Sequence, residues 1–260
     1  MSEGNVHGLT LEEFERMQPH AELQHDGMKM VFMTPSALTL WRVQSIRQKE
    51  PWTLEWIAQF GAEDVLLDCG ANVGMYTIWA AATRGVRVYA FEPEAQNYAL
   101  LNRNIMANRL DGRVHAFCMA LSDVAGLSTL HIADMRIGGS CHSLGEAVDH
   151  NHEPLEIVFR QSCIAGTIDE LVASGQIPVP NHIKIDVDGF EPKVIAGAAK
   201  TLARSEVRSL LVEINQRLED HLAIVSELNS MGYAHDPAQV ARAERKDGQF
   251  QGVAEYVFSR

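Results

Sequence analysis

The sequence lacks several signals that would place it in a common functional class. It has 22 Lys and Arg against 34 Asp and Glu, a formal net charge of -12, and no basic stripe. This charge disfavours binding of nucleic acid through a general electrostatic field. There is no N-terminal apolar signal and no run of about 18 apolar residues. We therefore expect a cytoplasmic protein that binds neither nucleic acid nor a membrane.

Cysteine is scarce and its positions form no paired motif. The chain contains Cys69, Cys118, Cys141 and Cys163, with no CxxC pair and no metal-type spacing. Cys69 and Cys118 lie in predicted core strand or turn positions, so we expect them to be reduced and structural. With 260 residues and 46% hydrophobic composition, the chain can form one large domain, or one domain with an extension.

The most informative stretch is Val65–Thr77, which predicts a strand, a glycine turn and a helix. A short apolar run ends at Asp68, glycines follow at Gly70 and Gly74, and a helical pattern covers Tyr76–Ala82. A strand that is apolar on both faces is typical of a buried parallel sheet. This unit begins a doubly wound fold, in which ligands bind at the carboxyl ends of strands.

The glycine spacing does not match a dinucleotide fingerprint. Counting from Gly70, the second and third glycines of Gly-x-Gly-x-x-Gly would fall at Asn72 and Met75. The observed pattern is Asp-x-Gly-x-Asn-x-Gly, and an acid and an amide suit a ligand that carries an ammonium group. S-adenosylmethionine is such a ligand. The alternative is an ordinary strand–helix turn whose glycines serve geometry alone.

A second strand, Val86–Phe91, ends in Glu92 and Pro93, before a predicted helix over Glu94–Ala107. In doubly wound folds an acid at this position binds ribose hydroxyls. A carboxylate can accept two hydrogen bonds from such a sugar. The alternative role for Glu92 is helix capping.

The third predicted strand is Val114–Met119, and the loop that begins at Ala120 and Leu121 would lie beside the adenine. Additional strands are predicted at Leu127–Ile132 and Ile157–Ile164. Between them lies an irregular insertion.

The insertion, Met135–His152, is rich in glycine, histidine and serine and has no clear period. Long irregular insertions in compact domains are usually either functional or disordered. We expect a lid on the substrate side. His142, His150 and His152 lack a helical metal-ligand spacing, so no metal site is predicted there.

Residues 1–60 are predicted to form a helical extension that packs on or caps the core, with the main domain at 61–260. A short helix is expected from Thr10 to Met17, a strand at Met28–Met33, and one or two helices within Trp41–Phe60. The last segment is either a plain packing element or a lid over a cofactor.

A strand near residue 185 places charges where apolar residues are expected. Alternation puts one set of side chains on one face and a second set on the other: Ile183, Ile185 and Val187 against Lys184, Asp186 and Asp188. Because unpaired buried charges are costly, these residues need a catalytic or binding role, or a self-neutralising Lys184–Asp186 ion pair. The next strand is Ser209–Asn215, and Val253–Phe258 should form an antiparallel strand at the sheet edge.

The ordered set of these motifs resembles the FkbM family of S-adenosylmethionine-dependent methyltransferases. The resemblance covers about Val65 to Asn215 and rests on the segments Asp68–Gly74, Phe91–Pro93, Leu121–Asp123, Ile183–Glu191 and Val212–Asn215. Asp188 departs from the family pattern, which more often has Glu before the glycine. An aspartate at this position keeps the negative charge and shortens the reach of the side chain.

The resemblance implies a Rossmann-like class I methyltransferase with a mostly parallel sheet, which methylates a hydroxyl of a small molecule such as a natural product or sugar. The implied catalytic residues are Asp186, Lys184, Asp188 and His142, with Asp186 as positioning group or base, Lys184 tuning its charge, and His142 as an alternative base. The implied cofactor-binding residues are Asp68, Gly70, Asn72, Gly74, Thr77, Glu92, Pro93, Ala120, Leu121 and Asp186. Asp68 and Gly70 would hold the methionine end.

The sequence leaves several alternatives open. Oxygen ligands from Asp186, Glu213 and Asn215 would suit magnesium, but the same residues could perform acid–base chemistry unaided, so no metal is predicted. Transfer to nitrogen, and a non-catalytic binding module of the same fold, are the rival functions. The sequence is compatible with a homodimer and does not identify the acceptor.

Overall fold

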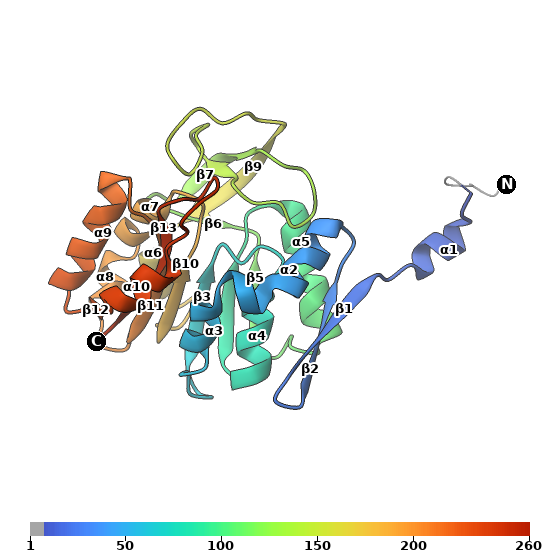
Figure 1. The fold of residues 1–260 in the computed structure, drawn as a ribbon, viewed down its shortest axis with the longest axis horizontal. Helices are drawn as coiled ribbons and strands as arrows, with labels where there is room; N and C mark the ends of the chain where they lie inside the picture. Colours follow the sequence, from blue (N-terminus) through green and yellow to red (C-terminus); the bar gives the residue numbers. More distant parts are fainter. Residues whose placement is uncertain (1–7) are drawn as a thin grey trace.

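The computed structural model describes residues 8–260 and contains a doubly wound α/β domain, as the sequence predicts (Figure 1). A 7-stranded sheet forms the centre. Its strands lie in the spatial order β5 (Val114–Phe117), β4 (Arg87–Phe91), β3 (Val65–Cys69), β10 (His182–Ile185), β11 (Ser209–Asn215), β13 (Val253–Ser259) and β12 (Ala234–His235).

The strand order reverses between β3 and β10. The chain runs outward from β3 to β4 and β5, and then returns to the other side of β3 to form β10 and β11. These five strands are parallel, so their carboxyl ends share one edge of the sheet. In open α/β sheets, ligands bind at this topological switch point.

The last strand is antiparallel, as predicted, but its predicted position at the sheet edge is wrong. β13 pairs with β11 on one side, and β12 pairs with it on the other and forms the edge. The sequence did not indicate β12, which covers only Ala234–His235. So short a strand carries no detectable alternation of its own.

Helices cover both faces of the sheet (Figure 1). One face carries α2 (Ala37–Lys49), α3 (Pro51–Ile57), α4 (Met75–Arg84) and α5 (Ala95–Ala107). The other carries α6 (Ile168–Ala173), α7 (Glu191–Ala196), α8 (Ala199–Leu202), α9 (Glu219–Ser230) and α10 (Pro237–Ala243). No helix among residues 8–260 has both the length and the apolar character needed to cross a membrane.

The two faces of β10 differ in chemistry, as its alternation predicts. Ile183 and Ile185 are fully buried in the core beneath α7 to α9. Lys184 points to the opposite face, where α2 to α4 lie, and is only 2% exposed. A charged side chain so deeply buried requires partners, and the site described below supplies them.

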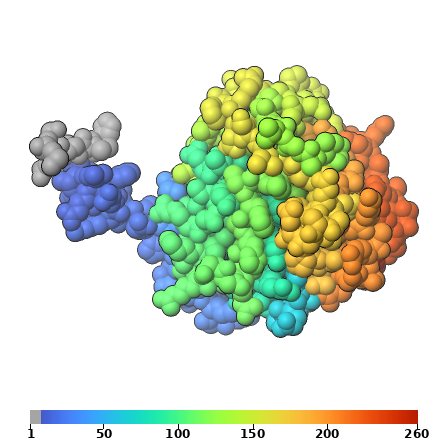
Figure 2. All heavy atoms as spheres, turned by 180° about the vertical axis from the view of Figure 1, so that it is seen from behind, coloured from blue at the N-terminus to red at the C-terminus, as the bar shows by residue number. Residues whose placement is uncertain are grey.

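The N-terminal extension is not purely helical, because it contains a hairpin of β1 (His20–His25) and β2 (Met28–Met33). The predicted strand at Met28–Met33 is present, and β1 was not predicted. Side chains of α5 hold this hairpin, since Oδ1 of Asn104 accepts from the Met33 amide at 2.8 Å. Helix α1 (Leu11–Arg16) has no buried residue and projects from the body in both views (Figures 1 and 2).

A smaller 4-stranded sheet lies beside the carboxyl edge of the main sheet, at the top of Figure 1. It consists of β6 (Ala120–Leu121), β9 (Phe159–Gly166), β7 (Gly126–Ile132) and β8 (Ser143–Leu144). The insertion predicted at Met135–His152 connects to this sheet and contains β8. This arrangement holds the irregular segment above the ends of the parallel strands.

Candidate active site

A large cavity opens where the parallel strands end. Its volume is about 1010 Å³, and its walls come from the glycine turn, the ends of β4, β10 and β11, the insertion, α2 and the loop at 247–250. Most of the predicted site residues line it: Gly70, Asn72, Glu92, Pro93, Ala120, Leu121, His142, Asp186 and Asp188. Four others lie outside its wall: Asp68, Gly74, Thr77 and Lys184.

The glycine turn brings the ends of β3 and β10 together. Gly70 has φ +80°, and a Cβ atom built on it would lie 1.9 Å from the backbone oxygen of Asp186. No side chain fits at that distance, so glycine is required for the two strand ends to meet. Gly74, at φ +85°, precedes α4 and packs against Leu101. It shapes the turn without reaching the cavity.

Asp68 is buried at the end of β3 and does not line the cavity. Its Oδ2 accepts a hydrogen bond from the Thr77 hydroxyl at 2.5 Å, and its Oδ1 has no partner among residues 8–260. Burial raises the pKa of Asp68, although the nearby Lys184 opposes this. The structure thus places Asp68 and Thr77 together as a buried pair inside the core.

Glu92 lines the cavity and is held firmly by backbone groups. The amide of Asn72 donates to its Oε2 at 2.7 Å, and the amide of Glu94 donates to its Oε1 at 2.8 Å. Burial raises the pKa of Glu92 to about 8, against the effect of these two hydrogen bonds. Helix capping, the alternative role, belongs instead to Glu94, which accepts from two amides at the start of α5.

The end of β10 contains the ion pair that the sequence left as an alternative. Nζ of Lys184 lies 2.7 Å from Oδ2 of Asp186. Burial by itself would raise the pKa of Asp186, but the positive charges of Lys184 and Lys49 outweigh it and lower the pKa to about 2. Asp186 is therefore ionised across the neutral range, and it lines the cavity.

Three carboxylates converge beside this pair. Ligand atoms of Asp186, Asp188 and Glu213 all lie within 4.8 Å of one another. Glu213 is bound by a protein cation, because Nη2 of Arg245 lies 2.7 Å from its Oε2. Asn215, the third magnesium ligand considered from the sequence, instead donates to the insertion at the backbone oxygen of His150.

The insertion is anchored over the glycine turn by hydrogen bonds to its backbone. Nδ2 of Asn72 and Nδ2 of Asn97 both donate to the oxygen of Gly139, at 2.7 and 3.0 Å. Oδ2 of Asp188 accepts from the Cys141 amide at 2.7 Å. These contacts place the segment that follows against the cavity.

His142 is the residue of this segment with free hydrogen-bonding capacity. It lines the cavity, and neither of its ring nitrogens has a partner within the described part of the chain. Burial lowers the pKa of His142, while the charge of Asp188 pulls in the opposite direction. The imidazole is consequently neutral at pH 7 and able to accept a proton.

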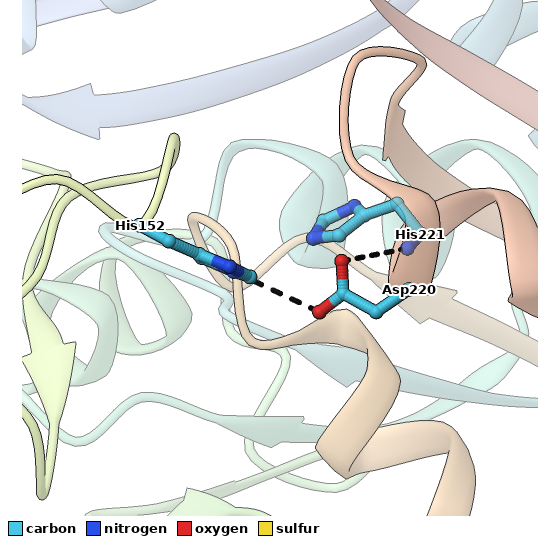
Figure 3. A group of neighbouring side chains, drawn as sticks. All are labelled: His152, Asp220 and His221. Atoms are coloured by element: carbon cyan, nitrogen blue, oxygen red, sulfur yellow. Dashed lines mark hydrogen bonds and ion pairs between the residues drawn. The ribbon is translucent and has the colours of Figure 1, made fainter.

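A second cluster of titratable groups lies at the start of α9 (Figure 3). Nε2 of His152 is 3.9 Å from Oδ2 of Asp220, and His221 lies beside them. Nδ1 of His221 accepts from the Asn215 amide at 3.2 Å, which assigns the proton to Nε2, 3.3 Å from the oxygen of Gly189. The ring nitrogen that faces the cluster is therefore a donor, and the cluster connects α9 to the insertion.

Sequence reasoning did not identify the cations and the acid that come from distant segments. Arg42 and Lys49 reach the cavity from α2, Glu50 lies beside them at the start of α3, and Arg245 arrives from the C-terminal region. No local motif marks these residues. Their proximity to the site depends on how the extension packs.

Comparison with known proteins gives a consistent match. The family model for the methyltransferase FkbM domain matches residues 68–234. The hexuronic acid methyltransferase AglP of Haloferax volcanii is 28% identical over 189 residues, which cover 73% of this chain and 72% of that protein. The 31-O-demethyl-FK506 methyltransferase FkbM of Streptomyces tacrolimicus is 29% identical over 155 residues, 52% of this chain and 59% of that protein.

A solved structure shares the fold. The methyltransferase FkbM of Methylobacillus flagellatus KT superposes with a TM-score of 0.51 at 14% sequence identity, over 78% of this chain. The chain spans 44% of that protein. It also spans less than two thirds of the Streptomyces relative.

Proposed function

This chain belongs to the FkbM family of methyltransferases, and we propose that it transfers the methyl group of S-adenosylmethionine to a hydroxyl of a small molecule, either a sugar or a hydroxylated natural product. One observation carries the proposal. The acid at the end of β4 and the proton acceptor of the insertion, Glu92 and His142, line the same cavity. Its volume of about 1010 Å³ has room for a cofactor and a small acceptor together.

The residues on the β4 side suit the nucleoside of the cofactor. Glu92 is buried and immobilised by two backbone amides, and its remaining lone pairs face the cavity. In its ionised form this carboxylate can accept hydrogen bonds from both ribose hydroxyls, and such hydrogen bonds favour the ionised form. Ala120 and Leu121 offer an apolar wall for the adenine. S-adenosylmethionine supplies, when bound, an electrophilic methyl group on a sulfonium that an acceptor oxygen can attack in line.

The residues on the insertion side suit proton removal. The acceptor hydroxyl must lose its proton as its oxygen bonds to the methyl carbon, and the neutral ring of His142 can take that proton. Asp186, whose pKa of about 2 keeps it ionised, is a poor base and acts as an orienting group for the acceptor hydroxyl. Lys184 holds Asp186 in place through their 2.7 Å ion pair.

The names of the relatives and the net charge of the chain support a small-molecule acceptor. The Haloferax protein is named for a hexuronic acid and the Streptomyces protein for the 31-O position of FK506, so both names point to small molecules. A net charge of -12 disfavours a polyanionic nucleic acid. We therefore place the acceptor among hydroxylated small molecules.

Calorimetry tests the cofactor first. We expect the purified full chain to bind S-adenosylhomocysteine in the micromolar range and to show no binding of NAD. Binding of NAD, or no binding of S-adenosylhomocysteine by folded protein, would contradict the proposal.

Acceptor class is tested by transfer of labelled methyl from S-adenosylmethionine to a panel of uronic acids, neutral sugars, hydroxylated macrolides and their amino analogues. Label on oxygen supports the proposal. Label on nitrogen alone would favour an N-methyltransferase, and cofactor binding without transfer to any class would favour a binding module.

A further inference from the structure

A second, smaller cavity lies beneath α2 and against the large one. Its volume is about 50 Å³, and its walls come from α2, the start of α3, the glycine turn and the start of α4. The two cavities share five lining residues: Arg42, Lys49, Gly70, Asn72 and Asp186. A volume of this size holds about three to five water-sized groups, which is the size of an amino-acid head group.

Arg42 contributes an unpaired cation to both cavities. Its Nε donates to the oxygen of Gly138 at 2.8 Å, and no carboxylate within residues 8–260 forms an ion pair with it. The other cations that line either cavity all have such partners: Lys49 with Glu50, Arg136 with Asp134, Lys184 with Asp186, and Arg245 with Glu213. The guanidinium of Arg42 thus retains donors for an anion.

One oxygen of the Glu50 carboxylate, in the wall of the small cavity, has no hydrogen-bond partner among the described residues. The residue is 1% exposed, and its Oε1 lies 2.5 Å from Nζ of Lys49 and 3.8 Å from Nη2 of Arg245. Its Oε2 is buried and accepts no hydrogen bond within the described residues, and a nearby hydroxyl is that of Tyr76 in the same cavity wall, whose pKa is raised by burial and by the charge of Glu50. A buried carboxylate oxygen without a donor is costly, and a ligand that brings a cationic donor would remove that cost.

We propose that the small cavity binds the amino-acid end of S-adenosylmethionine, with Arg42 pairing with its α-carboxylate and Glu50 accepting from its α-ammonium group. The inference rests on the proposed function, because it presumes this cofactor. The resemblance implied that Asp68 holds the methionine end, but Asp68 lines neither cavity. The inference assigns this contact to residues of the N-terminal extension instead. The turn residue Gly70 lines both cavities, so the two lie side by side at the glycine turn.

A carboxylate at Arg42 could also come from an acidic acceptor, and the experiment separates the two sources. The probes are S-adenosylhomocysteine and 5'-methylthioadenosine, which lacks the amino-acid end. For Arg42→Met we expect about 10- to 100-fold weaker binding of S-adenosylhomocysteine and unchanged binding of 5'-methylthioadenosine, because one charge-assisted contact is lost. Arg42→Lys should retain part of the affinity.

Glu50 is tested with decarboxylated S-adenosylhomocysteine, which keeps the amine and lacks the carboxylate. Glu50→Gln should weaken binding of this probe about 10-fold or more, whereas Arg42→Met should leave it unchanged. The matched control is Arg47→Met on the same helix, since Arg47 is exposed and stacks over Trp79 outside both cavities. Its affinity for all three probes should equal that of the wild type.

Two outcomes would overturn the inference. Equal weakening of S-adenosylhomocysteine and 5'-methylthioadenosine by Arg42→Met would indicate that Arg42 only supports the Gly138 loop. Unchanged binding of S-adenosylhomocysteine, with a raised KM for an acidic acceptor, would assign Arg42 to the acceptor. Failure of the proposed function looks different, because the wild-type protein would then bind none of the three probes.

Discussion

The backbone amide of Asn72 donates to Oε2 of Glu92 at 2.7 Å, so the turn after β3 and the acid at the end of β4 form one unit. Asn72 also extends its side chain to the Gly139 oxygen, which brings the insertion into the same unit. The nucleoside side and the lid side of the cavity are therefore mechanically connected. A change at Glu92 should affect both stability and ligand binding.

We expect Glu92→Gln to weaken binding of S-adenosylhomocysteine about 10- to 100-fold. The amide keeps the shape of the side chain, but it has one acceptor oxygen where the ionised carboxylate of the ligand-bound state has two. One hydrogen bond to a ribose hydroxyl or to a turn amide must then be lost. Calorimetry measures the effect, with Glu63→Gln on the exposed surface as the control. Equal affinities of variant and wild type would refute a ribose role for Glu92.

The same variant should change how stability depends on pH. Burial raises the folded-state pKa of Glu92 from 4.5 to about 8, so the folded state holds a proton that the unfolded state releases. The wild-type free energy of unfolding should therefore fall as pH rises from about 4.5 to about 8. In Glu92→Gln this slope should be shallower. Denaturant melts across that range test it, and parallel curves for the two proteins would contradict the assigned pKa.

Substitution of His142 should remove most of the methyl transfer while leaving cofactor affinity intact. We expect His142→Gln to lower kcat about 100-fold or more, the usual contribution of a general base. Because burial lowers the pKa of His142, the wild-type rate should be constant at neutral pH and fall only below its ordinary value of 6.5. In Asp188→Asn this acid limb should move to lower pH, since the charge of Asp188 raises the pKa of His142. If His142→Gln kept the pH profile of the wild type, His142 would be excluded as the general base.

Gly70→Ala should destabilise the fold by more than about 3 kcal/mol. The new Cβ would lie 1.9 Å from the Asp186 oxygen, at a φ of +80° that alanine rarely adopts. Gly112→Ala is the matched control, because nothing lies within 4 Å of its Cβ position. Thermal melts of both variants measure the difference. Equal stability would show that β3 and β10 can separate at their ends without cost.

Methyl transfer should be insensitive to EDTA. Asp186 forms an ion pair with Lys184, and Glu213 forms one with Arg245, each at 2.7 Å. Protein cations therefore occupy positions next to these carboxylates that a metal ion would otherwise take. The assay compares rates after dialysis against EDTA with rates in added magnesium. A rate that is lost in EDTA, restored by magnesium and abolished in Asp188→Asn would establish a metal site at this cluster.

The order of elements along the chain was largely determined by the sequence. This order could be predicted from local patterns, because a buried strand, a positive-φ glycine and an amphipathic helix each leave a short-range signal in the sequence. The unit around Gly70, the acid Glu92 and the alternation around Lys184 were all placed correctly in the fold. The elements that were missed are short or weakly patterned: β1, β6, β8, β12 and α10.

The partners of these residues, in contrast, depend on how distant segments pack. Alternation shows that Lys184 leaves the apolar face of its strand, but no local pattern shows that the Thr77 hydroxyl pairs with Asp68. It also does not show that Arg42 and Glu50 cover the same face from the N-terminal extension. Strand periodicity sets the direction of a side chain, whereas its partners come from segments distant in the sequence, brought near by packing that no local pattern encodes.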